Sequence, residues 1–137
     1  ANVIDPVKAE TISIDTVLRS FHKELPLRDS LVNFGLTLLG KPYVYGACSK
    51  DEFDCSGFVY YVFQQFKIQT PRSSLQFKDF GREVAIDNVK KGDILVFLSP
   101  TKNEIGHVGI VTGPNGMETR FIHASSGSEM KVIISSL

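Results

Sequence analysis

The amino-acid sequence predicts an α+β domain, with N-terminal helices packed on a small antiparallel sheet. Up to about residue 66 the apolar residues recur at helical spacing, and from residue 93 onward they fall in four short runs rich in β-branched and aromatic residues. A change from helical to strand-like period along one chain is typical of this class. The 137 residues are enough for one domain with its own core.

Two helices are predicted in the first forty residues. Residues 15–25, "DTVLRSFHKEL", have apolar side chains three and four positions apart, and Pro26 is expected to end this helix. Residues 28–40 repeat the pattern and stop at a glycine. We expect residues 1–27 to form a helical extension and residues 28–137 to form the main domain.

A third helix is predicted to begin at Cys55, because "DCSGFVYYVFQQF" carries a wide apolar stripe through Phe66. Residues 70–93 are expected to be irregular, with one helical turn. The four runs that predict strands are "DILVFLS", "HVGIVTG", "TRFIHASS" and "KVIISS".

The composition excludes several kinds of partner. Lys and Arg number 15, and Asp and Glu also number 15, so the formal net charge is zero. Because nucleic acids and anionic membranes are bound through clustered basic residues, neither is a predicted partner. No apolar run approaches the ~20 residues that span a bilayer. Two cysteines, Cys48 and Cys55, make neither a disulfide framework nor a zinc site, so no metal and no cofactor are predicted.

Cys55 is the predicted nucleophile. It stands in the first turn of a helix, where unpaired N–H groups and the macrodipole stabilise negative charge, and this position predicts a lowered thiol pKa. Asp54 is expected to be the N-cap, and Ser56 and Gly57 are expected to leave room for a substrate carbonyl. The N–H of Cys55 would then stabilise an oxyanion. The alternative is that Cys55 is a small buried core residue, as free cysteine often is.

Two histidines, His107 and His123, lie in predicted strands on either side of "GPNG", a strong hairpin signal. If the hairpin is symmetric about Asn115, His107 faces His123 directly, and Val108 faces Ile122 on the other side of the sheet. A slip of two residues would leave the histidines as diagonal neighbours. A slip of one would put one histidine on the opposite face.

This pair supplies what a cysteine nucleophile needs. His107 is the predicted general base and acid for Cys55, and His123 is predicted to hold the ring of His107 in the useful tautomer. Either strand histidine taken alone could equally have a structural role. The remaining histidine, His22, is expected to lie on a solvated helix face.

Six motifs, in order along the chain, resemble the NlpC family of bacterial cell-wall cysteine peptidases, whose fold is papain-like. They are "LGKPYVYGA", "DCSGFV", "PRSS", "KGDILVF", "HVGIVTG" and "FIHASS". The resemblance implies that Cys55, His107 and His123 take the positions of a Cys-His-His triad. It also implies that Tyr43 lines the site and helps to polarise the attacked carbonyl.

By the same resemblance, Asp54 and Ser56 match positions implicated in holding the free amino end of a peptide stem. Arg72 and Ser73 match the stretch beside the cleft, for which we expect a structural role. The implied activity is that of an endopeptidase, which hydrolyses the γ-D-glutamyl–diamino acid bond of peptidoglycan stem peptides through a thioester. We expect the protein to be a monomer and to act in the periplasm or outside the cell. The sequence leaves open whether its full-length precursor carries a lipid anchor.

Two other functions stay open. An amidase or acyltransferase of the same papain-like superfamily would keep the triad and change the pocket. A non-catalytic wall-binding domain would keep the fold and lose a triad residue, and the sequence retains all three.

The sequence departs from the family pattern near the site. The "WGG"-like element reads "YGA", with Tyr45 and Ala47, and we expect this to alter packing at the pocket edge. Cys48 stands in the loop before the nucleophile and is expected to be an incidental loop residue. The alternative for Cys48 is a regulatory disulfide with Cys55, which would silence the enzyme.

Overall fold

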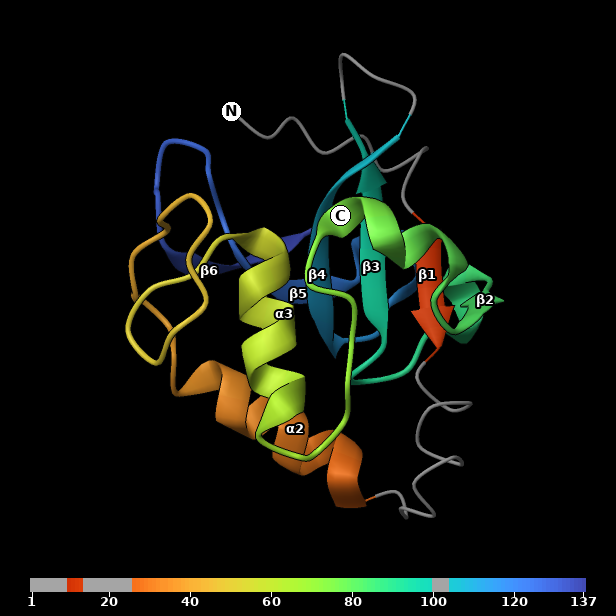
Figure 1. Cartoon of the computed structure of the whole chain (residues 1–137). Helices are drawn as coiled ribbons and strands as arrows, with labels where there is room; N and C mark the ends of the chain where they lie inside the picture. Colours follow the sequence, from red (N-terminus) through yellow and green to blue (C-terminus); the bar gives the residue numbers. More distant parts are fainter. Residues whose placement is uncertain (1–9, 14–25, 100–103) are drawn as a thin grey trace.

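The computed structural model describes residues 10–13, 26–99 and 104–137. In this part of the chain a six-stranded antiparallel sheet has the order β2-β1-β3-β4-β5-β6, and α3 lies across it in front of β4 and β5 (Figure 1). The elements are β1 Glu10–Ser13, α2 Pro26–Leu36, α3 Cys55–Gln64, η2 Ser74–Asp79, β2 Arg82–Val84, η3 Ile86–Asn88, β3 Ile94–Leu98, β4 Ile105–Gly113, η4 Gly116–Glu118, β5 Arg120–Ala124 and β6 Val132–Ser136, where η is a 3-10 turn.

The four predicted strands are confirmed as β3 to β6, which are neighbours in sequence order. Strands β1 and β2 were not predicted. They have four and three residues, too few for a period of two to stand out, and β2 is largely exposed. Strand β1 lies between β2 and β3, so Glu10–Ser13 of the expected helical extension belongs to the sheet. The helix expected at residues 15–25 lies outside the described residues.

The second helix begins two residues earlier than predicted. Pro26 is the first residue of α2 rather than the end of a preceding helix, which is physically reasonable because proline has a helical φ and the first turn needs no N–H bond. The chain leaves this region at Gly40, whose φ of +86° is left-handed. The buried Arg28 side chain joins α2 to the sheet through Asp93 at 2.9 Å.

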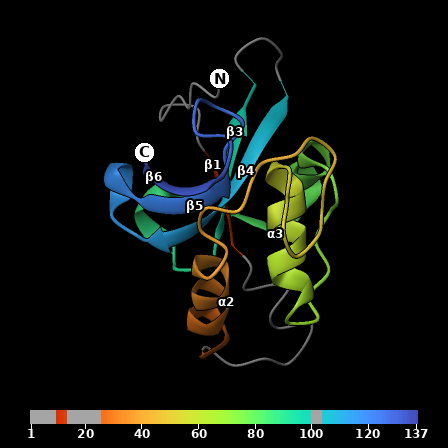
Figure 2. The same ribbon diagram turned by 90° about the vertical axis from the view of Figure 1, so that its left-hand side faces the viewer.

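The sheet separates two apolar clusters. The larger cluster lies between the sheet and the two helices, and its members include Phe58, Val62 and Ile110. The smaller cluster uses the alternate side chains on the other face, such as Phe97 and Phe121. Figure 2 shows α3 standing to one side of the strands. Strands β3, β4 and β5 are therefore buried on both faces in their central parts, which matches the near-continuous apolar sequence of β3.

Within the described residues, neither α2 nor α3 has the length and apolar character needed to span a lipid bilayer.

Candidate active site

Asp54 caps the helix that carries the candidate nucleophile. Its backbone is extended, with φ −89° and ψ −176°, and its Oδ1 accepts the Gly57 N–H at 2.6 Å. Cys55 is the first residue of α3. The predicted capping role of Asp54 and the predicted place of Cys55 are both confirmed.

Gly57 has a different role from the one that the sequence suggested. A Cβ at this position would lie 2.3 Å from the Ala47 carbonyl oxygen and 2.7 Å from Asp54 Oδ1. The same Ala47 oxygen accepts the Asp54 N–H at 2.9 Å. Gly57 is therefore needed because the loop before the helix packs directly against its first turn, and not to give a substrate access.

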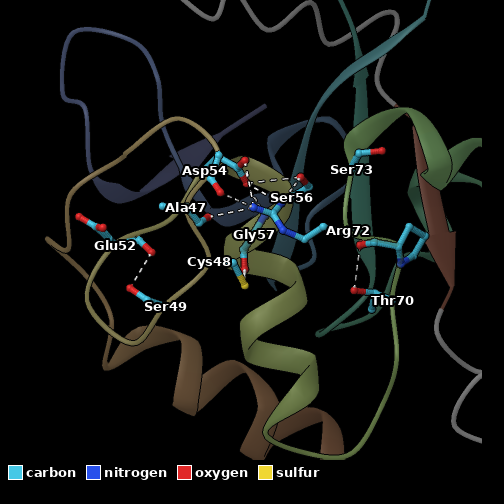
Figure 3. Close-up of polar contacts among 12 residues, drawn as sticks. Ala47, Cys48, Ser49, Glu52, Asp54, Ser56, Gly57, Thr70, Arg72 and Ser73 are labelled. Carbon is cyan, nitrogen blue, oxygen red and sulfur yellow. Dashed lines mark hydrogen bonds and ion pairs between the residues drawn. The ribbon is translucent and has the colours of Figure 1, made fainter.

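The guanidinium of Arg72 ties together the segments around the start of α3 (Figure 3). Its Nη1 donates to Asp54 Oδ1 at 3.0 Å and to Ser56 Oγ at 3.2 Å. Its Nη2 donates to Gly46 O at 3.0 Å, to Ala47 O at 3.3 Å and to Asp54 Oδ2 at 3.3 Å. These contacts explain the structural role expected for Arg72. Its planar, fork-shaped guanidinium group (the Arg72 fork) holds the N-cap residue and the loop before the nucleophile together.

The sulfur of Cys55 lies near β4, next to the end of the pairing between β4 and β5. The pairing of these strands runs from Gly113 opposite Arg120 to Ile110 opposite Ile122. Two residues beyond, the backbone N–H of Val108 favours negative charge on the Cys55 sulfur and so acts to lower its pKa. The candidate nucleophile therefore lies near the residue that directly follows His107.

The predicted lowering of the Cys55 pKa is wrong. Burial raises the pKa of the Cys55 thiol above its ordinary value of 9.0, and the charge of Asp54 raises it further. Backbone N–H groups of Ser56, Val108 and Cys55 itself act in the opposite direction and are outweighed. The helix end stabilises a thiolate, but loss of water from the sulfur has the larger effect. At neutral pH the resting thiol is protonated.

The two strand histidines meet on one face of the sheet, as predicted. His107 Nε2 lies 2.7 Å from His123 Nδ1, and both rings are buried. The register differs from direct opposition, because Ile122 faces Ile110 rather than Val108. This is the slip of two residues that leaves the histidines as diagonal neighbours.

Gly109 and Ser135 were missed by the sequence analysis. A Cβ on Gly109 would lie 3.2 Å from His123 Cβ and 2.9 Å from the Phe121 ring. The absence of a side chain at Gly109 therefore lets His123 and Phe121 of β5 lie close to the β4 backbone. Ser135 Oγ lies 2.8 Å from His123 Nε2. Alternation along β6 was the signal that could have placed Ser135 on this face.

The histidine pair is neutral at neutral pH. Burial, and then the neighbouring His123, lowers the pKa of His107 from 6.5 to about 3. Burial also lowers the pKa of His123 to about 4. Two uncharged rings are therefore joined by one hydrogen bond, in which one nitrogen donates and the other accepts.

These lowered pKa values predict a loss of stability in acid. Between pH 6.5 and about 3 the unfolded chain protonates these histidines and the folded protein does not, so the free energy of unfolding falls as pH falls through this window. His123→Gln keeps a polar group beside His107 and removes one of the two histidines whose pKa is lowered by folding. Urea unfolding at pH 7 and 4.5 should show a loss roughly 2 kcal/mol smaller for His123→Gln than for the wild type. Equal losses in the two proteins would contradict this assignment.

Tyr43 lies close enough to Cys55 and Asp54 to sense their charges. Burial, followed by the charges of Cys55, Asp54 and Tyr45, raises the pKa of Tyr43 to about 12. Its phenol therefore stays protonated and can donate a hydrogen bond. Tyr45 is 92% exposed, so the tyrosine in the "YGA" element is not packed into the domain. Ser56 is buried against Arg72.

Both cysteines are free thiols in this structure. Cys48 Sγ donates to Gly57 O at 3.4 Å, on the same turn of α3 that Cys55 begins. Burial raises the pKa of the Cys48 thiol, with Arg72 acting in the opposite direction. Cys48 thus has a packing contact of its own in the loop.

Removal of the Arg72 charge should slow alkylation of Cys55. The hydrogen bond and charge of Asp54, and to a smaller extent negative charge on Cys48 and Cys55, raise the pKa of Arg72 against the effect of burial, so the guanidinium in turn favours the thiolates. Asp54 disfavours the Cys55 thiolate. In Arg72→Met we expect alkylation of Cys55 by iodoacetamide at pH 8 to fall several-fold, and Arg72→Lys should restore part of the rate because the charge returns without the fork. Peptide mass spectrometry separates Cys55 from Cys48. Identical pH profiles for Arg72→Met and wild type would contradict the coupling.

This chain is similar to a known family and to several known proteins. The model of the NlpC/P60 family matches residues 40–137. The chain is 46% identical over 96 residues to gamma-DL-glutamyl hydrolase of Bacillus subtilis (strain 168), covering 69% of this chain and 22% of that protein. It is 38% identical over 99 residues to murein DD-endopeptidase MepS/murein LD-carboxypeptidase of Escherichia coli (strain K12), covering 72% of this chain and 48% of that protein.

Among solved structures, the crystal structure of the NlpC/p60 domain of the peptidoglycan hydrolase SagA superposes with a TM-score of 0.68 at 29% identity, covering 80% of this chain and 88% of that chain. The papain-like α+β arrangement implied by the motifs is thereby confirmed. The chain spans less than half the length of the two curated relatives. The family match nevertheless covers well over half of the described sequence and includes the helix-start cysteine and both strand histidines. The chain therefore belongs to the NlpC/P60 family of cysteine peptidases, as its six ordered motifs predicted.

Proposed function

We propose that this chain is the catalytic domain of a peptidoglycan endopeptidase that cleaves the γ-D-glutamyl–diamino acid bond of stem peptides. The observations that carry the proposal are the hydrogen-bonded pair of His107 and His123 and a cysteine at a helix start, whose pKa is influenced by the backbone of Val108, the residue after His107. The 46% identical relative is a gamma-DL-glutamyl hydrolase, which favours a γ-glutamyl amide as the bond attacked. A substrate of this kind places the protein in the cell envelope.

In the proposed first step the thiol of Cys55 loses its proton to His107 as the sulfur attacks the γ-carbonyl carbon. Nε2 of His107 is directed at His123, so Nδ1 is the nitrogen that takes this proton. Because the resting thiol and imidazole are both neutral, transfer accompanies attack and no ion pair forms beforehand. The C–N bond then breaks, and His107 gives the proton to the leaving amine of the diamino acid.

The second step hydrolyses the thioester on Cys55. His107, neutral again, takes a proton from water as the oxygen attacks the thioester carbonyl. The C–S bond breaks, the γ-carboxylate leaves, and the sulfur is protonated again. His123 accepts from His107 Nε2–H throughout and so limits rotation of the ring.

Three further side chains are proposed to form the substrate-binding site. Tyr43 is a protonated donor near Cys55 and suits a role at the carbonyl oxygen. Asp54 accepts three contacts at Oδ1 and a long one of 3.3 Å at Oδ2, so Oδ2 has the greater capacity left to accept from the free amine of a stem peptide. Ser56 shares the Arg72 fork with Asp54 and fixes the direction of that carboxylate.

Digestion of purified peptidoglycan, followed by mass spectrometry of the muropeptides, tests this function. We expect fragments with a new N-terminal diamino acid from the wild type and none from Cys55→Ala. Glycan strands stripped of their peptides would instead indicate an amidase. Cleavage of peptide cross-links between two D-residues would instead indicate a DD-endopeptidase, an activity named for the 38% identical relative. No product, with a folded protein, would favour a non-catalytic wall-binding domain.

A further inference from the structure

We infer that Ser135 is a positioning residue that fixes the tautomer of His123, and through it the tautomer of His107. The inference rests on the proposed function, in which His107 is the base for Cys55. Ser135 Oγ lies 2.8 Å from His123 Nε2. Ser135 pairs with Phe121 across β5 and β6, so it lies one diagonal step from His123. The bonded groups of His107, His123 and Ser135 thus cross three neighbouring strands on one face of the sheet.

The proton positions follow from what His107 has to do. A neutral imidazole has one N–H, and Nδ1 of His107 must be bare in order to accept the thiol proton. The proton of His107 is therefore on Nε2, which donates to His123 Nδ1 across 2.7 Å. His123 then carries its own proton on Nε2. That N–H needs an acceptor, and the Ser135 hydroxyl is placed to accept it.

The opposite arrangement of protons would be inactive. If Ser135 donated to His123 Nε2, His123 Nδ1 would carry the proton and donate to His107 Nε2. The proton of His107 would then sit on Nδ1, and this nitrogen could not receive the proton of Cys55. The hydroxyl of Ser135 is half-buried, so its own hydrogen can point to solvent while its lone pair accepts from His123.

The surroundings of the pair make this acceptor important. The ring of Phe121 is centred 4.6 Å from that of His123, and the ring of Phe97 is centred 6.0 Å from that of His107. An N–H placed among apolar rings loses its bonds to water, so the tautomer in which it finds an acceptor is favoured. Ser135 is the side chain that offers this acceptor to His123 Nε2.

Three variants test the inference by activity. Ser135→Ala should lower kcat on a stem peptide about tenfold and leave KM within about twofold, because substrate contacts are untouched. Ser135→Thr keeps the hydroxyl on a side chain suited to a strand and should retain most of the rate. Ser136→Ala is the matched control, since Ser136 is exposed and its side chain points to the other face of β6. Wild-type kcat in Ser135→Ala would overturn the inference.

Nitrogen NMR of ¹⁵N-histidine-labelled protein at pH 7 tests the tautomer itself and needs no turnover. We expect His123 of the wild type to carry its proton on Nε2, and Ser135→Ala to show a mixture of both tautomers. A His123 protonated on Nδ1 in the wild type would overturn the inference even if Ser135→Ala does not fold. An inactive wild type with the expected tautomer would instead count against the proposed function alone.

Discussion

Replacement of Cys55 by alanine is expected to lower kcat/KM on stem peptides by at least roughly 10⁴-fold. The sulfur is the atom proposed to form the thioester, and an alanine side chain cannot replace it as a nucleophile. The fold should persist, because the cap of Asp54 on Gly57 and the fork of Arg72 do not use the sulfur. Cys55→Ser should be nearly as inactive, since a buried hydroxyl is a far weaker acid than a thiol.

The measurement is release of the diamino acid amine, together with thermal unfolding to verify the fold. Cys48→Ala is the matched control, because its thiol bonds to the Gly57 carbonyl and has no place in the proposed chemistry. It should keep most of the activity. Turnover by Cys55→Ala above a few per cent of wild type would refute the covalent mechanism.

Gly57→Ala is expected to cause the largest loss of stability among single substitutions near the site. The added methyl would lie 2.3 Å from Ala47 O and 2.7 Å from Asp54 Oδ1, and the first of these atoms belongs to the backbone and cannot rotate away. The loop would have to leave the helix start, with loss of the Asp54 N–H bond to Ala47 and of the Arg72 contact there. We expect about 3 kcal/mol or more, together with loss of activity.

Gly35→Ala is the control for this substitution. Gly35 lies inside α2, and a Cβ there would meet Phe58 Cζ at 3.6 Å and Ile122 Cγ2 at 3.9 Å, which are ordinary contacts. Because alanine favours the helix by about 1 kcal/mol over glycine, Gly35→Ala should be neutral or slightly stabilising. Urea unfolding of both variants measures the difference. Equal stability of Gly57→Ala and wild type would show that the loop is not held against the helix as described.

The parts of the site that depend on local chemistry could be predicted from the sequence. An aspartate before a helix caps it through its own side chain, so the place of Cys55 at the start of α3 followed from neighbours in the chain. Strand alternation put His107 and His123 on one face for any even slip of register.

The other features of the site depend on tertiary packing and could not be predicted from the sequence. The pairing of Ile110 with Ile122 depends on the turn at Gly116–Glu118 and on the irregularity after Val111, neither of which has a sequence signature strong enough to fix a register. Contact of Arg72 with Asp54 joins residues 18 positions apart. The raised pKa of Cys55 reflects burial against the sheet, which a helix-end argument leaves out.

The most direct test of the central claim is the kcat/KM of His107→Ala and His123→Ala measured on the same stem peptide. The claim is that His107 moves the proton of Cys55 while His123 only orients the ring. His107→Ala should lose roughly 10³-fold or more, close to Cys55→Ala, and His123→Ala should lose about 10- to 100-fold. Wild-type values for both histidine variants would contradict the account.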